Sequence, residues 1–441
     1  MSLYWLSTLP LAIAAVLYFI GRRRRGLVVL LALLTSLVCT NLALTLPTDT
    51  TTAFLGQKWF LEQDSQALLV FMYAVTTVLF SVAALSKSED ALYAPVLAST
   101  GVLSAVVLID SLALSFVLLP IALVVLGLGV VSHTRSSTLG ASSFLAWATL
   151  PTPFLLAIWP LLERLVLRPE DFYLVQWSAW LVVPPVMLWL TLFPLHWTTR
   201  LWAENGRTLV PAFLWTVKDG VVLFLLFALW RQAPVLCEKG PINALGLTGL
   251  LTAVVSGVLA FLHPSPGAVL ACAAMSELGI AVQGIAARSA DGLQGALMLL
   301  VGRCAAILLA SAALAGICVA SAERGETNTR PFCWRILVML LAFTVGVLAL
   351  AGMPPLLGFL GRSRVYAALD AQGPYLFLAW LSGSVGIVLG LVRAVWSTWC
   401  MKLRFPEGRI YDLLVLVVLC LLVLCVGIGL SPQMPLSPVP D

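Results

Sequence analysis

The sequence predicts an all-α polytopic membrane protein, and three observations carry that prediction. Of its 441 residues, 61% are hydrophobic and only 10% are charged, with a mean hydropathy of +1.03. A soluble domain has about 25% charged residues, so this chain lacks the charge to cover a surface that faces water. Its apolar runs are nearly continuous over about twenty residues, the length of a helical span, whereas barrel strands alternate over about ten residues. An ordinary soluble enzyme, a disordered chain and a disulfide scaffold are excluded.

The chain is expected to cross the membrane about fourteen times. The predicted spans cover residues 3–20, 27–46, 66–85, 91–109, 111–131, 140–160, 177–195, 208–230, 243–262, 267–287, 293–321, 335–369, 375–401 and 411–430. The span at 335–369 is too long for one straight crossing. Because Gly352, Pro354 and Pro355 lie in its middle, it is expected to break there.

The basic residues of the loops are distributed unevenly between the two sides that fourteen spans define. With Arg22–Arg25 placed in a cytoplasmic loop, fourteen basic residues fall on that side and six on the other. Cytoplasmic loops carry an excess of lysine and arginine, so both termini are expected on the non-cytoplasmic side. The arginine block therefore indicates topology rather than a surface for nucleic acid, and no nucleic-acid partner is expected.

No cofactor or metal site is expected from the sequence. The nine cysteines include no C-x-x-C pair and the chain has only three histidines, which argues against zinc, an iron–sulfur cluster or a disulfide framework. The sequence also contains no G-x-G-x-x-G turn and no phosphate-binding P-loop pattern. We therefore expect no catalytic residue of the chain's own, although membership of an enzyme complex stays open.

Two apolar segments are interrupted by proline in a comparable way. Pro194 interrupts the seventh span, and Pro354 with Pro355 interrupts the twelfth. The two interruptions are five spans apart, so the second segment enters the membrane the other way up. Paired broken helices in an inverted repeat point to a binding site near the membrane midplane, because a break frees N–H and C=O groups there. The alternative is that these prolines only kink their helices.

The residues around both interruptions resemble a known family. Phe193–Trp197 reads F-P-L-H-W and is followed by Lys218, and residues 351–362 read A-G-M-P-P-L-L-G-F-L-G-R. These segments are similar to P-x-H-x-W on helix seven, the lysine of helix eight and G-x-P-P-x-x-G-F-x-G-K on helix twelve of the antiporter-like subunits. That family comprises subunits of respiratory complex I, of Mrp-type sodium/proton antiporters and of membrane-bound hydrogenases. The resemblance covers roughly residues 90–400.

The resemblance implies fourteen helices with two inverted five-helix repeats, in which helices seven and twelve are broken. Residues 1–90 would form helices one to three, 91–231 the first repeat, 243–401 the second repeat, and 402–441 helix fourteen with a short tail. It also implies an integral protein of the bacterial cytoplasmic membrane. The expected partners are the lipid bilayer and other membrane subunits of a multi-subunit complex, including other antiporter-like chains.

The resemblance further implies proton or sodium transfer along a polar axis at mid-membrane, from which this sequence departs. The family places a glutamate on helix five, lysines on helices seven, eight and twelve, and a histidine and a lysine on helix eleven. At the corresponding positions other than helix eight this chain has Ser115, Trp189, Arg303, Ile307 and Arg362. Only Lys218 keeps the family's residue type. Since arginine does not release its proton in proteins and tryptophan fills the space of a hydrated lysine, the N-terminal half-channel is expected to be disabled.

The candidate axis and the helix breaks are predicted by the ionisable groups and prolines that lie within the spans. An ionisable group inside a bilayer costs about 2.5–3.5 kcal/mol on insertion scales, so its first interpretation is functional. The predicted axis comprises Lys218, Glu277, Arg303, Arg362 and His196, and the predicted breaks lie at Pro194, Pro354 and Pro355. Arg364 and Arg393 are explained without a site, as charges near helix ends that reach toward the boundary.

Each axis residue also has a structural interpretation. Lys218 either relays protons or is neutralised by a neighbour, although Asp219 is expected to point to another helix face. Glu277 either forms a static ion pair with Arg303 or titrates. Arg362 either belongs to the axis or caps carbonyls that the break frees. His196 either gates protons or bonds to backbone.

The sequence leaves several functions open. The favoured one is an antiporter-like subunit of a proton- or sodium-translocating complex, with a degenerate axis that reduces or abolishes conduction. The alternatives are a non-conducting scaffold subunit of such a complex and a stand-alone secondary transporter. An enzyme for lipid-linked substrates ranks last, because the longest loops at 47–65 and 322–334 contain no carboxylate–histidine set.

Overall fold

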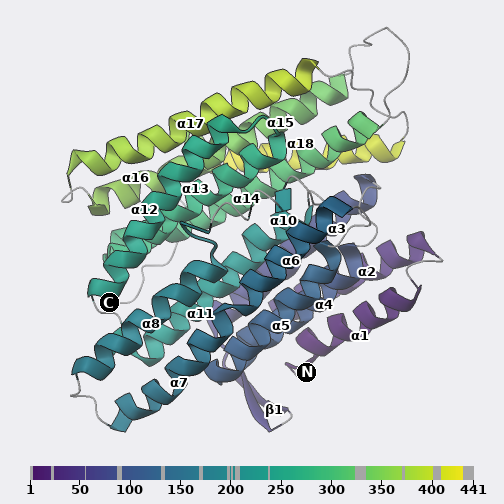
Figure 1. Ribbon diagram of the computed structural model, residues 1–441. Helices are drawn as coiled ribbons and strands as arrows, with labels where there is room; N and C mark the ends of the chain where they lie inside the picture. Colours follow the sequence, from purple (N-terminus) through teal and green to yellow (C-terminus); the bar gives the residue numbers. More distant parts are fainter. Residues whose placement is uncertain are drawn as a thin grey trace. The chain divides into compact units, whose positions relative to one another are not determined.

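The chain folds into two compact units in the computed structural model (Figure 1). One consists of Met1–Leu190 with Asn205–Pro241, and the other of Thr191–Glu204 with Ile242–Asp441. The structure describes residues 3–20, 24–54, 56–86, 92–130, 135–167, 172–195, 199, 202–203, 209–236, 239–322, 334–369, 373–400 and 409–430.

The first unit is built from apolar helices and one β-hairpin. Its helices are α1 (Trp5–Ile20), α2 (Arg25–Thr45), α3 (Gln63–Ser86), α4 (Tyr93–Leu108), α5 (Leu112–Val130), α6 (Arg135–Thr149), α7 (Pro151–Leu167), α8 (Phe172–Trp189), α10 (Leu209–Phe213), the π-helix η2 (Leu214–Lys218), α11 (Asp219–Gln232) and the 3₁₀-helix η3 (Pro234–Leu236). The predicted span 140–160 is covered by α6 and α7 rather than one helix. Their junction at Leu150 directly precedes Pro151, and proline disfavours a helical conformation in the residue before it.

A hairpin follows α2, where the sequence analysis expects only a loop. Strands β1 (Thr50–Phe54) and β2 (Gln57–Leu61) pair antiparallel, and Gly56 adopts a positive φ of 75° in the turn between them. The strands contain three threonines, a tryptophan and two phenylalanines, which favour β structure. The Asp110 amide donates to the Lys58 carbonyl at 3.1 Å, so the hairpin is attached to the end of α4.

The second unit surrounds one fully enclosed helix. Its helices are α12 (Lys239–Leu262), which enters the unit at Ile242, α13 (Pro266–Ala286), α14 (Ala290–Ala322), α15 (Trp334–Leu350), α16 (Leu357–Leu369), α17 (Pro374–Cys400) and α18 (Arg409–Leu430). Every residue of α13 from Ala268 to Ile285 is buried. The Ser265 side chain caps α13 by accepting a hydrogen bond from the Ala268 amide, and Pro266 follows at the first helical position. Any ionisable group on this helix must find its partners inside the protein.

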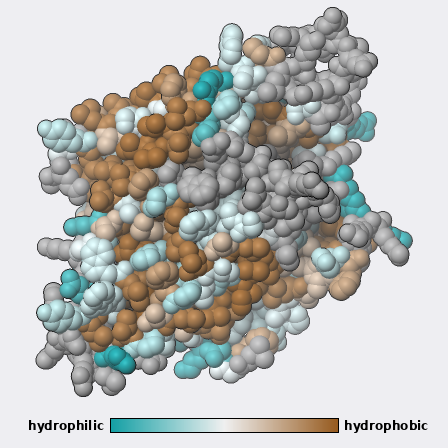
Figure 2. Space-filling model, viewed as in Figure 1, coloured by the Kyte–Doolittle hydropathy of each residue, from teal (hydrophilic) through white to brown (hydrophobic). Residues whose placement is uncertain are grey.

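Many of the described helices match a membrane span in length and composition. Nine are long and apolar enough to cross a bilayer, and five more apolar helices of 10–17 residues occur in the same described ranges. Large apolar side chains are exposed along α2, α8 and α17, among others. Figure 2 shows hydrophobic residues over much of the coloured part of the visible face. A lipid environment accounts for this exposure, while fourteen crossings and the repeat boundaries stay predictions.

Candidate functional site

The first interrupted helix ends at Trp189. Thr191 has a positive φ of 52°, and the peptide between Phe193 and Pro194 is cis. The last carbonyls of a helix have no intrahelical donor, so α8 leaves acceptors free at this point. His196, predicted to lie beside this break, is outside the described residues.

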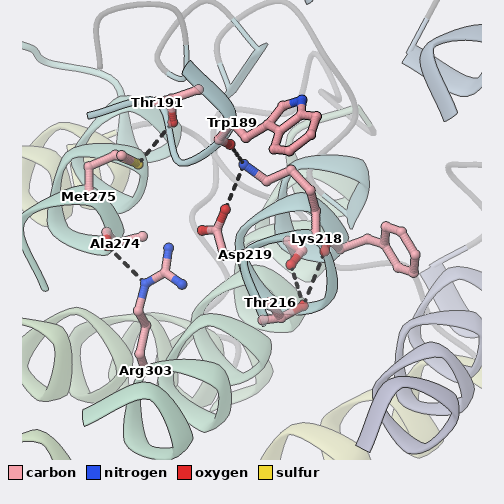
Figure 3. A network of polar contacts seen from close by, with 10 residues as sticks. Trp189, Thr191, Thr216, Lys218, Asp219, Ala274, Met275 and Arg303 are labelled. Atoms are coloured by element: carbon pink, nitrogen blue, oxygen red, sulfur yellow. Dashed lines mark hydrogen bonds and ion pairs between the residues drawn. The ribbon is translucent and has the colours of Figure 1, made fainter. Parts of the chain in front are cut away.

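Lys218 supplies a donor to the end of α8. Its Nζ donates a hydrogen bond to the Trp189 carbonyl at 2.5 Å and forms an ion pair with Asp219 Oδ1 at 2.6 Å (Figure 3). The lysine is only 3% exposed and Asp219 only 1%. A buried charge is tolerated when it is paired and hydrogen-bonded, and both conditions are met at this lysine.

The contact between Lys218 and Asp219 corrects the expectation that Asp219 points to another face. Lys218 is the last residue of the π-helix Leu214–Lys218, which lies between the α-helical segments α10 and α11. A π-turn widens the helix locally and changes the direction of the side chains that follow. At this turn the long lysine side chain reaches the carboxylate of its neighbour. Such π-turns frequently mark functional sites.

The surroundings of Trp189 are apolar. Its side chain is 4% exposed, and its ring lies 6.3 Å from the ring of Phe116, measured between centroids. The indole Nε1 donates to the Ala148 carbonyl at 3.3 Å. Ser115, at the position expected for the family's helix-five glutamate, is buried, and its hydroxyl donates to the Val106 carbonyl. Both side chains are thus bonded to backbone near the place where the axis is expected.

The second interrupted helix consists of two parts: α15 ends at Leu350, and α16 begins at Leu357. Gly352 has a positive φ of 72°, and an added Cβ there would collide with the Arg362 side chain. The peptide between Pro354 and Pro355 is cis. A glycine is required at 352 for two reasons, the backbone conformation and the close approach of Arg362.

Arg362 closes this second break. Its Nη2 donates to the carbonyl of Leu350, the last residue of α15, at 2.5 Å, and its Nη1 donates to Ser384 Oγ at 2.8 Å. The side chain is 2% exposed. The planar guanidinium thus joins the end of α15 to α17, which is the capping arrangement weighed for Arg362.

The carboxylate of Glu277 lies beside Arg362. Arg362 Nη2 is 3.5 Å from Glu277 Oε2, and Glu277 is fully buried on the enclosed helix α13. The carboxylate has space because residue 358 is glycine. A Cβ added at Gly358 would lie 2.8 Å from Glu277 Oε1, which is too close for a side chain there. This small residue of the G-x-P-P-x-x-G motif therefore makes room for the acidic group.

Arg303 was the predicted partner of Glu277. Its Nε donates to the Ala274 carbonyl at 3.0 Å, one turn from Glu277 on α13, and its side chain is 1% exposed (Figure 3). Arg303 and Arg362 both interact electrostatically with the Glu277 carboxylate. The ion pair within 4 Å is the one with Arg362, so the nearer partner of Glu277 is a different arginine from the one predicted.

The sequence did not predict several polar residues at and near the second break, which with Glu277, Arg303 and Arg362 form a polar cluster. Ser384 bonds Arg362, and the indole of Trp380 donates to the side-chain oxygen of Gln283 on α13. Serine and glutamine inside apolar runs are the signal that would have identified them. No group of three or more His, Cys, Asp or Glu side chains capable of holding a metal ion occurs in the described ranges. The cluster contains one ionisable carboxylate and arginines that keep their charge.

A known family matches the middle of the chain. The family described as NADH:quinone oxidoreductase/Mrp antiporter, transmembrane, matches residues 161–390. Among curated proteins, NADH-quinone oxidoreductase subunit N of Geotalea uraniireducens (strain Rf4) is 28% identical over 254 residues, covering 55% of this chain and 52% of that protein. The chain thus spans about half the length of the curated relatives it matches.

Solved structures share the fold over nearly the whole chain. A chain of the Mrp complex from Dietzia sp. DQ12-45-1b matches with a TM-score of 0.77 and 15% identity, covering 97% of this chain and 94% of that one. A chain of respiratory complex I from Thermus thermophilus matches with a TM-score of 0.76 and 21% identity, covering 96% and 95%. With the apolar helices described above, these similarities show an integral membrane protein of this fold.

Proposed function

The chain belongs to the NADH:quinone oxidoreductase/Mrp antiporter transmembrane family, and on that basis we propose that it is an antiporter-like subunit of an ion-translocating membrane complex. The ion is a proton or sodium. We further propose that the polar axis is degenerate, so that conduction through this chain is reduced or abolished. The energy source lies in partner subunits or in an ion gradient, since the sequence carries no flavin, quinone or nucleotide motif of its own.

Residue chemistry supports a degenerate axis. A proton relay needs groups that alternate between protonated and deprotonated forms within reach of one another. At the two interruptions the chain offers Trp189 and Arg362, of which the first does not titrate and the second stays charged in proteins. Trp189 is packed against Phe116 in the first unit, which leaves apolar contacts where a hydrated side chain would be needed.

One observation carries the proposal: Lys218, the only axis position that keeps the family's lysine, is fixed by two short contacts. The Trp189 carbonyl and the Asp219 carboxylate hold its Nζ at 2.5 and 2.6 Å. Both acceptors come from within the first unit. A lysine held in this way stabilises the end of α8 instead of exchanging protons with a distant neighbour.

Co-purification tests the subunit assignment. The complex is extracted from native membranes in a mild detergent, and the co-migrating chains are identified by mass spectrometry. We expect several other membrane subunits, including other antiporter-like chains. Recovery of this chain alone, as a stable monomer or dimer, contradicts the assignment and favours the stand-alone transporter.

A charge-preserving variant tests the degenerate axis. Lys218→Arg keeps the positive charge and the donors for Trp189 and Asp219 but cannot give up a proton. In vesicles that contain the purified complex, we expect the rate of ion translocation to stay within about twofold of the wild-type rate. A loss of at least tenfold in a variant complex of normal subunit composition contradicts the proposal, because it requires Lys218 to titrate.

A non-conducting scaffold is the second candidate, and the Arg362 geometry favours it. The guanidinium bonds the Leu350 carbonyl and Ser384 and lies next to Glu277, which is a structural use of a family position. The two candidates differ in whether any ion passes through this chain. Glu277→Gln in the complex separates them, since an unchanged translocation rate with intact assembly favours the scaffold and a reduced rate favours residual conduction.

A further inference from the structure

Arg393 has an unusual position among the arginines of the second unit. It lies on α17, within the candidate membrane span Tyr375–Cys400. Among the described residues it forms no hydrogen bond and no ion pair, and its Nε and Nη2 are shielded from solvent without a partner. Its guanidinium lies over the ring of Phe261, whose centroid is 5.8 Å from the guanidinium carbon. A cation–π contact at this distance offsets little of the free energy that is needed to hold a charged guanidinium near the membrane interior.

The packing of α12 against α17 indicates how deep in the membrane Arg393 lies. An added Cβ at Gly386 would collide with the backbone of Gly257, and one at Gly390 with the backbone of Ala260. The two helices are therefore parallel and in close contact along this seam. Three residues after Gly390, Arg393 is level with the end of α12 at Leu262. A short segment leads from there to Pro266, so this level is close to the boundary of the membrane.

The length of α17 agrees with this depth. Its 27 residues span about 40 Å at 1.5 Å per residue, which exceeds a hydrocarbon core of about 30 Å. Arg393 precedes the last helical residue, Cys400, by seven positions, or about 10 Å. It thus lies a few ångströms inside the hydrocarbon edge, within the reach of a long side chain that extends toward the headgroups.

The side chains around Arg393 face lipid. Phe261 and Leu262 on α12 are exposed, as are Val392 and Trp396 on α17. Trp396 is 69% exposed and lies one turn after the arginine. Tryptophan is enriched at the headgroup level, where its ring is partly apolar and partly polar. Among the residues that the structure describes, the guanidinium is therefore bordered by apolar side chains and an interfacial tryptophan, and it pairs with no carboxylate.

We propose that Arg393 binds the phosphodiester group of an anionic phospholipid at the edge of α12 and α17. Nη1, the guanidinium nitrogen that is not shielded, would donate a charge-assisted hydrogen bond to a phosphate oxygen. The acyl chains would lie along the exposed apolar side chains of Phe261, Leu262 and Val392. Trp396 would pack beside the headgroup. A second membrane boundary arginine shows the contrast: Arg335 pairs with Asp412 at 2.7 Å within the unit and needs no external anion.

Native mass spectrometry of the complex from mixed micelles tests this site. The probe lipids are phosphatidylglycerol and phosphatidylcholine, and the variants are Arg393→Gln and the matched control Arg335→Gln, which removes the same charge from an arginine that already has a carboxylate. Attraction of one arginine to an anionic lipid surface is worth about 1 kcal/mol, or about fivefold in affinity. We expect phosphatidylglycerol retention to fall about fivefold in Arg393→Gln and to be unchanged in Arg335→Gln.

Three results contradict the site. Equal loss of phosphatidylglycerol in both variants shows a general charge effect, and unchanged retention in Arg393→Gln shows that this arginine binds no lipid. Loss of a partner subunit from Arg393→Gln without loss of lipid shows that a partner carboxylate occupies the position. If Arg393→Gln does not assemble, the two lipids are compared on the wild-type complex. Equal retention of phosphatidylglycerol and phosphatidylcholine contradicts the proposal, and selective retention of phosphatidylglycerol supports it. The lipid site is independent of whether this chain conducts ions.

Discussion

The two interrupted helices free the same kind of backbone acceptor and stabilise it with different cations. At the first, the Trp189 carbonyl accepts a hydrogen bond from Lys218, whose countercharge is the next residue on the same helix. At the second, the Leu350 carbonyl accepts from Arg362, whose countercharge Glu277 lies on another helix. A carbonyl without a donor is costly in an apolar interior, so each break requires a cation or another donor.

The difference between the two breaks lies in what each cation can do. Lysine can lose its proton when its countercharge is removed, and so avoids a buried uncompensated charge. Arginine cannot, and its planar fork also connects more partners at fixed geometry. The first break therefore depends on a local contact, which tolerates loss of the countercharge. The second depends on a tertiary contact among α13, α15, α16 and α17, which does not tolerate that loss.

The largest effect is expected from Glu277→Gln. This variant keeps the size of the side chain but leaves Arg362 buried without its nearby carboxylate, and arginine cannot neutralise itself. Breaking a buried pair by removing one partner costs about 3–5 kcal/mol, so we expect the free energy of unfolding to fall by about that amount. Chemical unfolding in micelles, followed by circular dichroism, measures the change.

Asp219→Asn is the matched comparison at the first break. It also removes one buried carboxylate, but Lys218 retains the hydrogen bond to the Trp189 carbonyl. We expect a smaller loss, about half that of Glu277→Gln. If Asp219→Asn destabilises the protein as much as Glu277→Gln, the proposed difference between lysine and arginine does not hold.

The next effect is expected from Arg362→Lys. The substitution keeps the charge, but a single ammonium cannot donate to both the Leu350 carbonyl and Ser384 in the geometry of the guanidinium. Hydrogen bonds to charged groups contribute about 1.5–3 kcal/mol each, so the free energy of unfolding should fall by about that range. Ser384→Ala removes one of the same two bonds, and the double variant should be less destabilised than the sum of the single variants. Strict additivity would show that the two residues do not interact.

Gly358→Ala tests whether space beside Glu277 is limiting. The added Cβ would lie 2.8 Å from Glu277 Oε1 and would also collide with the backbone of Ala349, which has little freedom to move. Overpacking of a well-packed interior costs about 1–3 kcal/mol. Gly427→Ala on α18 is the control, since nothing lies within 4 Å of its added Cβ and alanine favours a helix. Equal stability of the two variants would contradict the packing argument.

The sequence was sufficient to locate most helices and the family, because long apolar runs and the G-x-P-P-x-x-G pattern are local features. Helices end at Trp189 and Leu350, beside the prolines from which interruptions were expected. The contacts of the cations were harder to predict. The Lys218–Asp219 pair lies at a π-turn that no local pattern indicated, and the approach of Arg362 to Glu277 depends on how α13 and α16 pack.

The smallest effect is expected from Arg231→Gln, at the exposed end of α11. Arg231 pairs with Glu62 at 2.7 Å and with Asp64 at 2.9 Å, both shorter than the 3.5 Å between Arg362 and Glu277. Water screens these exposed charges, and exposed pairs are worth about 0–1 kcal/mol, so the unfolding free energy should change by less than about 1 kcal/mol. The remaining effect should shrink when the salt concentration is raised from 0.05 to 0.5 M (test values chosen to shorten the screening length). If Arg231→Gln instead destabilises the protein as much as Glu277→Gln, burial is not what makes the longer pair the more important one.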